Sequence, residues 1–101
     1  MRYRVRFTAE ANDDLDELYR FQVENDLDAA EEALAAIGQA LTMLEIFPFS
    51  CRKPADGRTG ALLRELVVPF GSAGYVVLFE ISNRDTVTVL AIRHQREADY
   101  H

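Results

Sequence analysis

The chain has 101 residues, a length that fits one domain and excludes two. Apolar residues make up 49% of it, which is enough for a hydrophobic core and excludes an intrinsically disordered chain. The 17 acidic and 11 basic residues give a formal net charge of −6, and this balance opposes non-specific binding to nucleic acids. We therefore predict a single domain over residues 1–101.

The cysteine count and the apolar runs exclude several kinds of site and location. Cys51 is the single cysteine, so no internal disulfide is expected, and no Cys/His spacing is that of a zinc site. The residues after Arg6 are polar and acidic where a signal peptide needs an apolar run, and no stretch approaches the ~18 apolar residues of a membrane span. We expect a cytoplasmic protein with no metal, no cofactor and no membrane contact.

Residues 2–7 alternate strictly between arginines and the apolar Tyr3, Val5 and Phe7, which predicts a half-buried strand. Thr8 follows as a candidate helix N-cap, and acids in the next turns lie where the helix dipole favours negative charge. Apolar residues then recur three and four apart, as in an amphipathic helix: Ala11, Leu15, Leu18 and Tyr19.

A second helix is predicted to begin at Asp28, because Glu31 three residues later resembles a capping box. Asn25 and Asp26 form the loop before it, and Pro48 ends it. Its apolar stripe steps by four and three residues: Ala30, Leu34, Ile37, Leu41 and Leu44. The short loop predicts that the two helices form an antiparallel hairpin.

Three strand-like runs follow an irregular stretch at residues 49–60. The runs span residues 62–68, 75–82 and 86–93. Short turns at residues 71–74 and 83–85 separate them, so we expect an antiparallel meander. The predicted order is β-α-α-β-β-β, an α+β fold whose N-terminal helical hairpin packs on one face of a small, mainly antiparallel sheet.

Charge is divided unevenly along the chain. Residues 8–47 contain 11 acids and one base, Arg20, a balance of −10, whereas the rest contain 10 bases and 6 acids, a balance of +4; the two sum to −6. Acids on solvated helix faces are the simple explanation for any single position. The contrast between the regions favours two surfaces with different partners.

The last two strand-like runs are apolar on both faces. Val76 and Leu78 alternate with the other apolar residues of their run, as Leu90 and Ile92 do in theirs. Two helices cover only one face of such a sheet. The other face must therefore be covered by the C-terminal residues, by self-association or by a partner.

The C-terminal run at residues 93–101 gathers both histidines, two arginines and Tyr100. Arg64, on the first strand of the meander, could lie near it across the sheet. Arginines with a histidine or a tyrosine could bind a phosphate and transfer a proton, as an RNA-cleaving site requires. The same residues could instead form a polar terminus, in which the arginines pair with Glu97 and Asp99.

Cys51 stands beside Arg52 and Lys53. Neighbouring bases could lower the pKa of its thiol and make it a nucleophile. No base partner is identifiable in the sequence, so a packing role for Cys51 is the preferred interpretation.

Four segments carry a family resemblance: FPFSCRK at 47–53, LREL at 63–66, GYVVLFEI at 74–81 and VLAIRHQRE at 89–97. With the first strand and the acidic hairpin before them, they resemble toxins of the RelE/ParE superfamily, in the ParE-like, plasmid-stabilisation branch. The resemblance covers nearly the whole chain, and it lies in the order and spacing of the segments.

The resemblance implies the toxin of a type II toxin–antitoxin system, neutralised in a hetero-oligomer by a ParD-like antitoxin whose C-terminal segment wraps it. RelE-type members cut mRNA in the ribosome, and ParE-type members poison DNA gyrase. By position, Arg64 resembles an arginine that both branches often keep. His94 and Arg96 fall where the family places polar or basic residues, and Tyr100 lies near the RelE tyrosine.

The acidic balance favours a protein target, so we expect gyrase poisoning without catalysis. The alternatives are a ribosome-dependent mRNA interferase that uses Arg64, His94, Arg96 and Tyr100, and a non-toxic antitoxin-binding homologue. The target-binding candidates are Arg64, Arg93, His94 and Arg96. The antitoxin-binding candidates are Leu15, Leu18, Tyr19, Val76, Leu78, Leu90 and Ile92.

Overall fold

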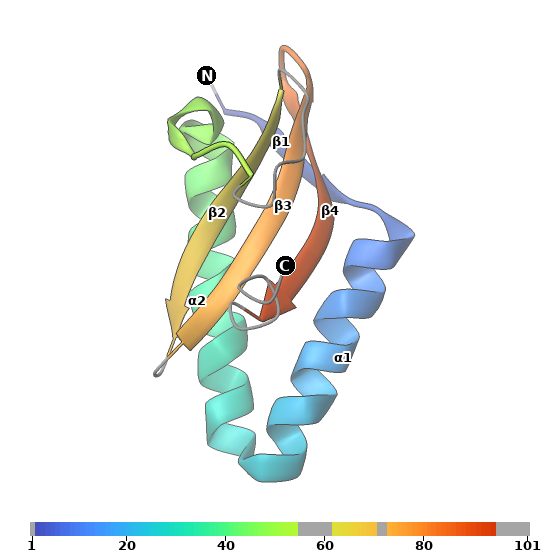
Figure 1. The fold of residues 1–101 in the computed structure, drawn as a ribbon, viewed down its shortest axis with the longest axis vertical. Coiled ribbons are helices and arrows are strands. Elements are labelled where there is room, and N and C mark those ends of the chain that lie inside the picture. The colour runs from blue at the N-terminus through green and yellow to red at the C-terminus, as the bar shows by residue number, and fades with distance from the viewer. Residues whose placement is uncertain (1, 55–61, 71–72, 95–101) are drawn as a thin grey trace.

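The computed structural model describes residues 2–54, 62–70 and 73–94 (Figure 1). The elements are β1 (Arg4–Phe7), α1 (Ala9–Asn25), α2 (Leu27–Ile46), the 3-10 turn η1 (Pro48–Ser50), β2 (Leu63–Phe70), β3 (Ala73–Asn83) and β4 (Thr86–His94). The predicted β-α-α-β-β-β order is confirmed. No helix in the described ranges is both long and apolar enough to cross a bilayer.

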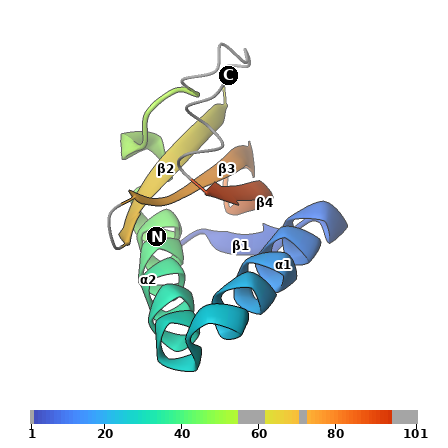
Figure 2. The same ribbon diagram turned by 60° about the horizontal axis from the view of Figure 1, so that its bottom comes forward.

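The four strands form one mixed sheet in the order β1-β4-β3-β2. The pairs β2–β3 and β3–β4 are antiparallel, as predicted for the meander, and β1 lies parallel to β4. The chain therefore leaves one edge of the sheet after β1, passes through both helices, and re-enters at the opposite edge as β2. Both helices lie on the same face of the sheet (Figure 2).

Capping residues fix the ends of the two helices. The Thr8 hydroxyl accepts a hydrogen bond from the Ala11 N–H at 3.1 Å, which confirms Thr8 as the N-cap of α1. The prediction for α2 is wrong by one residue, because the helix begins at Leu27. Its cap is Asp26, whose carboxylate accepts from the Asp28 N–H at 2.9 Å. Asp26 is thus the single residue between the two helices.

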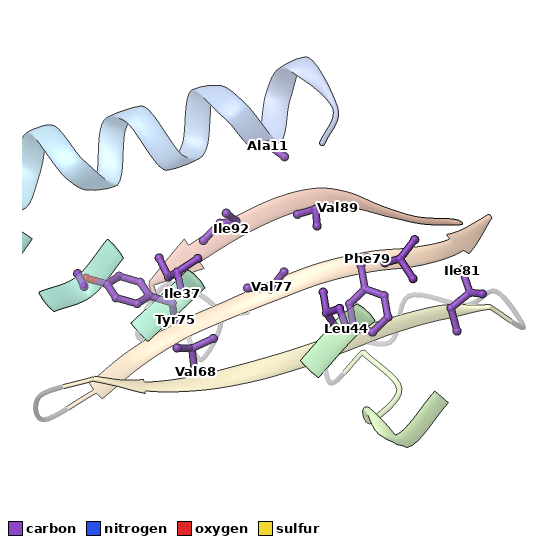
Figure 3. Close-up of a cluster of buried hydrophobic side chains, with 12 residues drawn as sticks. Ala11, Ile37, Leu44, Val68, Tyr75, Val77, Phe79, Ile81, Val89 and Ile92 are labelled. Carbon is purple, nitrogen blue, oxygen red and sulfur yellow. The ribbon is translucent and has the colours of Figure 1, made fainter. Parts of the chain in front are cut away.

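The core lies between the hairpin and one face of the sheet (Figure 3). Alternate residues of β3 point into it, and Ile37, Leu41 and Leu44 of the predicted α2 stripe pack against them, joined by Ala33, which was not predicted. Ala11 contributes from α1. The core residues that β3 contributes are Tyr75, Val77, Phe79 and Ile81.

A β-bulge in β4 changes which residues face the helices. Leu78 pairs with Ala91 and Phe79 pairs with Val89, so Leu90 is the extra residue. The bulge shifts the alternation by one position, and Ile92 joins Val89 in the core. The prediction that Ile92 faces away from Val89 is therefore wrong, because strict alternation ignores the inserted residue.

Val76 and Leu78 lie on the face of β3 that points away from the helices, as the alternation predicts. Their exposed fractions are nevertheless only 6% and 8%. These two antitoxin-binding candidates therefore offer little surface to a partner in the uncomplexed chain.

The placement of the bulge predicts how two substitutions in β4 change the free energy of unfolding. We expect Ile92→Ala to lower the free energy of unfolding by about 2–5 kcal/mol, because it leaves a cavity in the core. Leu90→Ala should lower it by distinctly less, since Leu90 is half-buried and outside the core cluster. Denaturant titration of both variants measures the difference. Equal losses would contradict the placement of the bulge.

Candidate functional site

A cleft of about 850 Å³ opens between α1 and the end of the sheet where β3 begins and β4 ends. One wall is the second half of α1, which extends past the end of β4 (Figure 1). The other wall comes from the sheet, with Tyr75, Ile92, Arg93 and His94.

Two polar contacts hold α1 against the sheet along this cleft. β1 ends at Phe7, opposite Val89, so the outer edge of β4 has no strand beside it further on. There the Asp14 carboxylate accepts a hydrogen bond from the Ile92 N–H at 3.0 Å. Eight residues along α1, the Gln22 amide donates to the Tyr75 hydroxyl at 2.8 Å. The helix is therefore fixed to the sheet at two points roughly 12 Å apart.

Tyr75 forms the floor of the cleft between two other rings. The Phe70 ring stacks on it at a centroid distance of 5.8 Å, and the His94 ring meets it edge-on at 5.7 Å. Burial raises the pKa of the Tyr75 phenol, and the hydrogen bond from Gln22 opposes this shift only in part. The phenol therefore stays protonated at neutral pH and binds through hydrogen bonds rather than as a base.

The two walls differ in charge. The α1 wall carries Asp14, Glu17 and Glu24 along with Arg20, whereas the sheet wall carries Arg93 and His94. Within the described residues, no group of three His, Cys, Asp or Glu side chains is placed to hold a metal ion. The arrangement suits a peptide-like ligand that presents apolar and charged groups together.

An apolar rim accompanies these charges, and the sequence patterns missed most of it. Phe21 is 61% exposed at the edge of the cleft, and Leu18 is half-buried beside it. Val23 and Leu27 add exposed apolar surface close to the tip of the hairpin. Phe21 falls off the predicted stripe of α1, and an aromatic residue on the polar side of an amphipathic helix is the signal that could have found it.

The structure separates the predicted catalytic residues. Arg64 pairs in register with Phe79, and His94 pairs with Tyr75, four residues away along β3. That offset is roughly 13 Å along the strand, and β2 and β4 lie on opposite sides of β3. Arg64 therefore does not lie near His94, and the rest of the C-terminal run, residues 95–101 with Arg96 and Tyr100, lies outside the described residues.

Arg64 lies instead on the edge strand β2, next in the chain to Glu65, which forms a polar cluster with Arg52. Arg52 donates to Glu65 through Nε and Nη2, both at 2.7 Å from Oε1, and its carbonyl accepts from the Glu65 N–H at 2.9 Å. Glu65 is only 7% exposed, so this pair ties the segment after η1 to the sheet. No sequence signal links the two residues across 13 positions.

Cys51 packs beside this cluster, against the core. Burial raises the pKa of its thiol, and the nearby Arg64 guanidinium lowers it by less. A raised pKa keeps the thiol protonated at neutral pH, which supports the packing interpretation over a nucleophile.

Comparisons with known proteins agree on one family. The family model described as the ParE toxin of the type II toxin–antitoxin system parDE matches residues 5–99. A putative toxin, Y4kP of Sinorhizobium fredii, is 35% identical over 98 residues, which cover 95% of this chain and 92% of the relative.

Two solved structures share the fold. One, from the chromosomal ParDE toxin–antitoxin system of P. aeruginosa, superposes with a TM-score of 0.71 at 17% identity and covers 92% of this chain and 96% of its own. The other, from the toxin–antitoxin complex RelBE2 of Mycobacterium tuberculosis, gives a TM-score of 0.60 at 26% identity, with 93% and 99% covered. Since the family model spans nearly the whole chain and the curated relative is 35% identical over the same extent, this chain belongs to the ParE toxin family of type II toxin–antitoxin systems, within the RelE/ParE superfamily.

Proposed function

We propose that this type II toxin is neutralised by a ParD-like antitoxin that binds in the cleft between α1 and β4, and that the free toxin poisons DNA gyrase in the cytoplasm. The observation that carries the antitoxin part is the cleft itself, with an exposed aromatic rim and an acidic helical wall. The two similar structures come from toxin–antitoxin systems, which supports a partner of this kind.

The chemistry of the cleft specifies the antitoxin segment that would fit. Phe21 and Leu18 offer apolar contact to an aliphatic or aromatic anchor. Glu17 and Glu24 face the same space and would attract a lysine or arginine next to that anchor. An amphipathic helix with basic residues beside its apolar stripe meets both requirements.

The predicted antitoxin contacts differ in how well they suit this role. Leu18 and Ile92 line the cleft, and Leu15, Tyr19 and Leu90 are half-buried. We propose Leu18 as the principal contact, with Leu15, Tyr19 and Leu90 as further contacts. Ile92 is only 4% exposed and, like Val76 and Leu78, offers little surface to a partner. Val76 and Leu78 would become contacts only if the antitoxin displaced what covers them.

The proposal that the target is gyrase depends on the chemistry of the described side chains. Arg64 and His94 are too far apart to act on one phosphate, and the Tyr75 phenol and the Cys51 thiol both stay protonated. These features favour a toxin that binds a protein over one that cleaves RNA. We propose Arg64, Arg93, His94 and Arg96 as target-binding residues. The likeness to the toxin–antitoxin complex RelBE2 is compatible with the alternative, an mRNA interferase.

The antitoxin proposal is tested by reversing the charge of the acidic wall. We expect Glu17→Lys combined with Glu24→Lys to weaken binding of the cognate antitoxin about 10- to 100-fold, because its basic residues would then meet like charges. High salt should weaken the wild-type complex without abolishing it. Calorimetric titration of purified toxin with antitoxin measures both effects.

The matched control is Glu31→Lys combined with Glu32→Lys, which makes the same charge change on the exposed surface of α2, away from the cleft. It should leave the affinity within about threefold of wild type. An equal loss in both double variants would show that net charge, and not the cleft, governs binding.

The target is tested with the purified toxin in two assays. We expect inhibition of DNA supercoiling by gyrase and no cutting of ribosome-bound mRNA. Arg93→Ala should reduce gyrase inhibition about tenfold or more, while an unchanged thermal unfolding midpoint confirms that the variant is folded. Site-specific mRNA cleavage in a translation extract would sink the gyrase proposal, and normal growth on induction of the chain alone would favour a non-toxic homologue.

A further inference from the structure

The face of the sheet opposite the helices carries a row of arginines along the β1 edge. Arg4 and Arg6 are exposed, whereas Val5 and Phe7 between and after them pack against the core. The arginines therefore point away from the helical layer. Among the described residues, no acid forms an ion pair with either of them.

Hydroxyl groups lie beside this row on the neighbouring strands. Arg4 is in register with Thr86 and Arg6 with Thr88. The Thr88 hydroxyl is 2.7 Å from the Ser82 hydroxyl, on the next strand. Hydroxyls and guanidinium groups are the side-chain donors that proteins use most on phosphate oxygens.

The spacing of the arginines suits a linear polyanion better than a single small anion. Residues two apart on a strand are roughly 6.8 Å apart. Double-stranded DNA carries closely spaced phosphates along each strand, so two guanidinium groups in one row can each contact a phosphate of the same strand.

The division of charge orients the molecule toward such a partner. Residues 8–47, nearly all of them in the two helices on one face of the sheet, carry a balance of −10. The remaining residues carry +4. A polyanion is therefore repelled by the helical layer. On the opposite face it meets Arg4 and Arg6 together with Glu80, which is in register with Thr88, so an approach with the two arginines leading is favoured even though the whole chain is acidic.

We propose that the sheet face around Arg4, Arg6 and Thr88 binds the phosphate backbone of double-stranded DNA. The biological role of this contact rests on the proposed gyrase target, since a toxin bound to gyrase lies close to the duplex that the enzyme holds. The contact itself is independent of gyrase and of the antitoxin cleft, which lies on the helix-covered side.

The test is binding of the purified full-length toxin to a labelled duplex of about 30 base pairs, followed by fluorescence anisotropy over a range of salt concentrations. We expect Arg4→Gln combined with Arg6→Gln to weaken binding about tenfold or more at low salt. The slope of log affinity against log salt should shrink by about two, since each phosphate contact contributes roughly 0.9.

The control is Lys53→Gln, which removes an exposed charge beyond the β2 edge, at the other side of the sheet. It should leave the slope unchanged. Antitoxin binding by the double variant, equal to that of wild type, shows that the variant is folded. Absence of duplex binding by wild type at low salt, or equal affinity in the double variant and Lys53→Gln, would overturn the proposal.

Competition identifies the class of partner. Unlabelled duplex should displace the label, whereas a poly-glutamate of equal charge or a single-stranded RNA should displace it at least tenfold less well. Equal displacement by either competitor would overturn the assignment to duplex DNA. Gyrase inhibition is measured separately, so duplex binding that depends on Arg4 and Arg6 would stand even if wild-type toxin left gyrase unaffected.

Discussion

The hydrogen bond from the Ile92 N–H to the Asp14 carboxylate is the contact on which the cleft depends. β1 is too short to cover the whole outer edge of β4, and an unpaired backbone donor at that edge would be costly if left unsatisfied. Asp14 satisfies it from α1 and so fixes the distance between helix and sheet. The bulge at Leu90 lies just before this bond and turns Ile92 into the core at the same place. Backbone pairing, core packing and the shape of the cleft are therefore set together.

The helical layer and the opposite face of the sheet differ in charge as well as in packing. The helices carry most of the acids, some of which line the cleft, while the sheet carries Arg4 and Arg6 on its other face, where no acid among the described residues pairs with them. The two proposed partners, a basic antitoxin helix and an anionic duplex, would thus bind to different faces. Both could be bound by one chain at the same time, because neither surface uses residues of the other.

Local chemistry made most of the fold predictable, and long-range pairing did not. The Thr8 cap, the end of α2 before Pro48 and the alternation of β1 each depend on a few neighbouring residues. The bulge at Leu90 could not be predicted from the sequence, because residues 89–92 are all apolar and their pattern does not show where the alternation shifts. For the same reason alternation could not place Ile92. The site was harder still: Arg64 and His94 are separated by the order of strands, and the Gln22–Tyr75 bond spans 53 positions.

The single-residue joint at Asp26 has a consequence for how the toxin meets its partners. Asp26 closes α1 with its N–H to the Gln22 carbonyl at 2.8 Å and opens α2 with its carboxylate, so the two helices share one rigid corner. A joint of one residue restricts how α1 can move relative to α2, and the bonds from Asp14 and Gln22 hold α1 against the sheet. Under the proposed function, binding would then require little ordering of the cleft, and the entropy lost on association would fall mainly on the antitoxin segment.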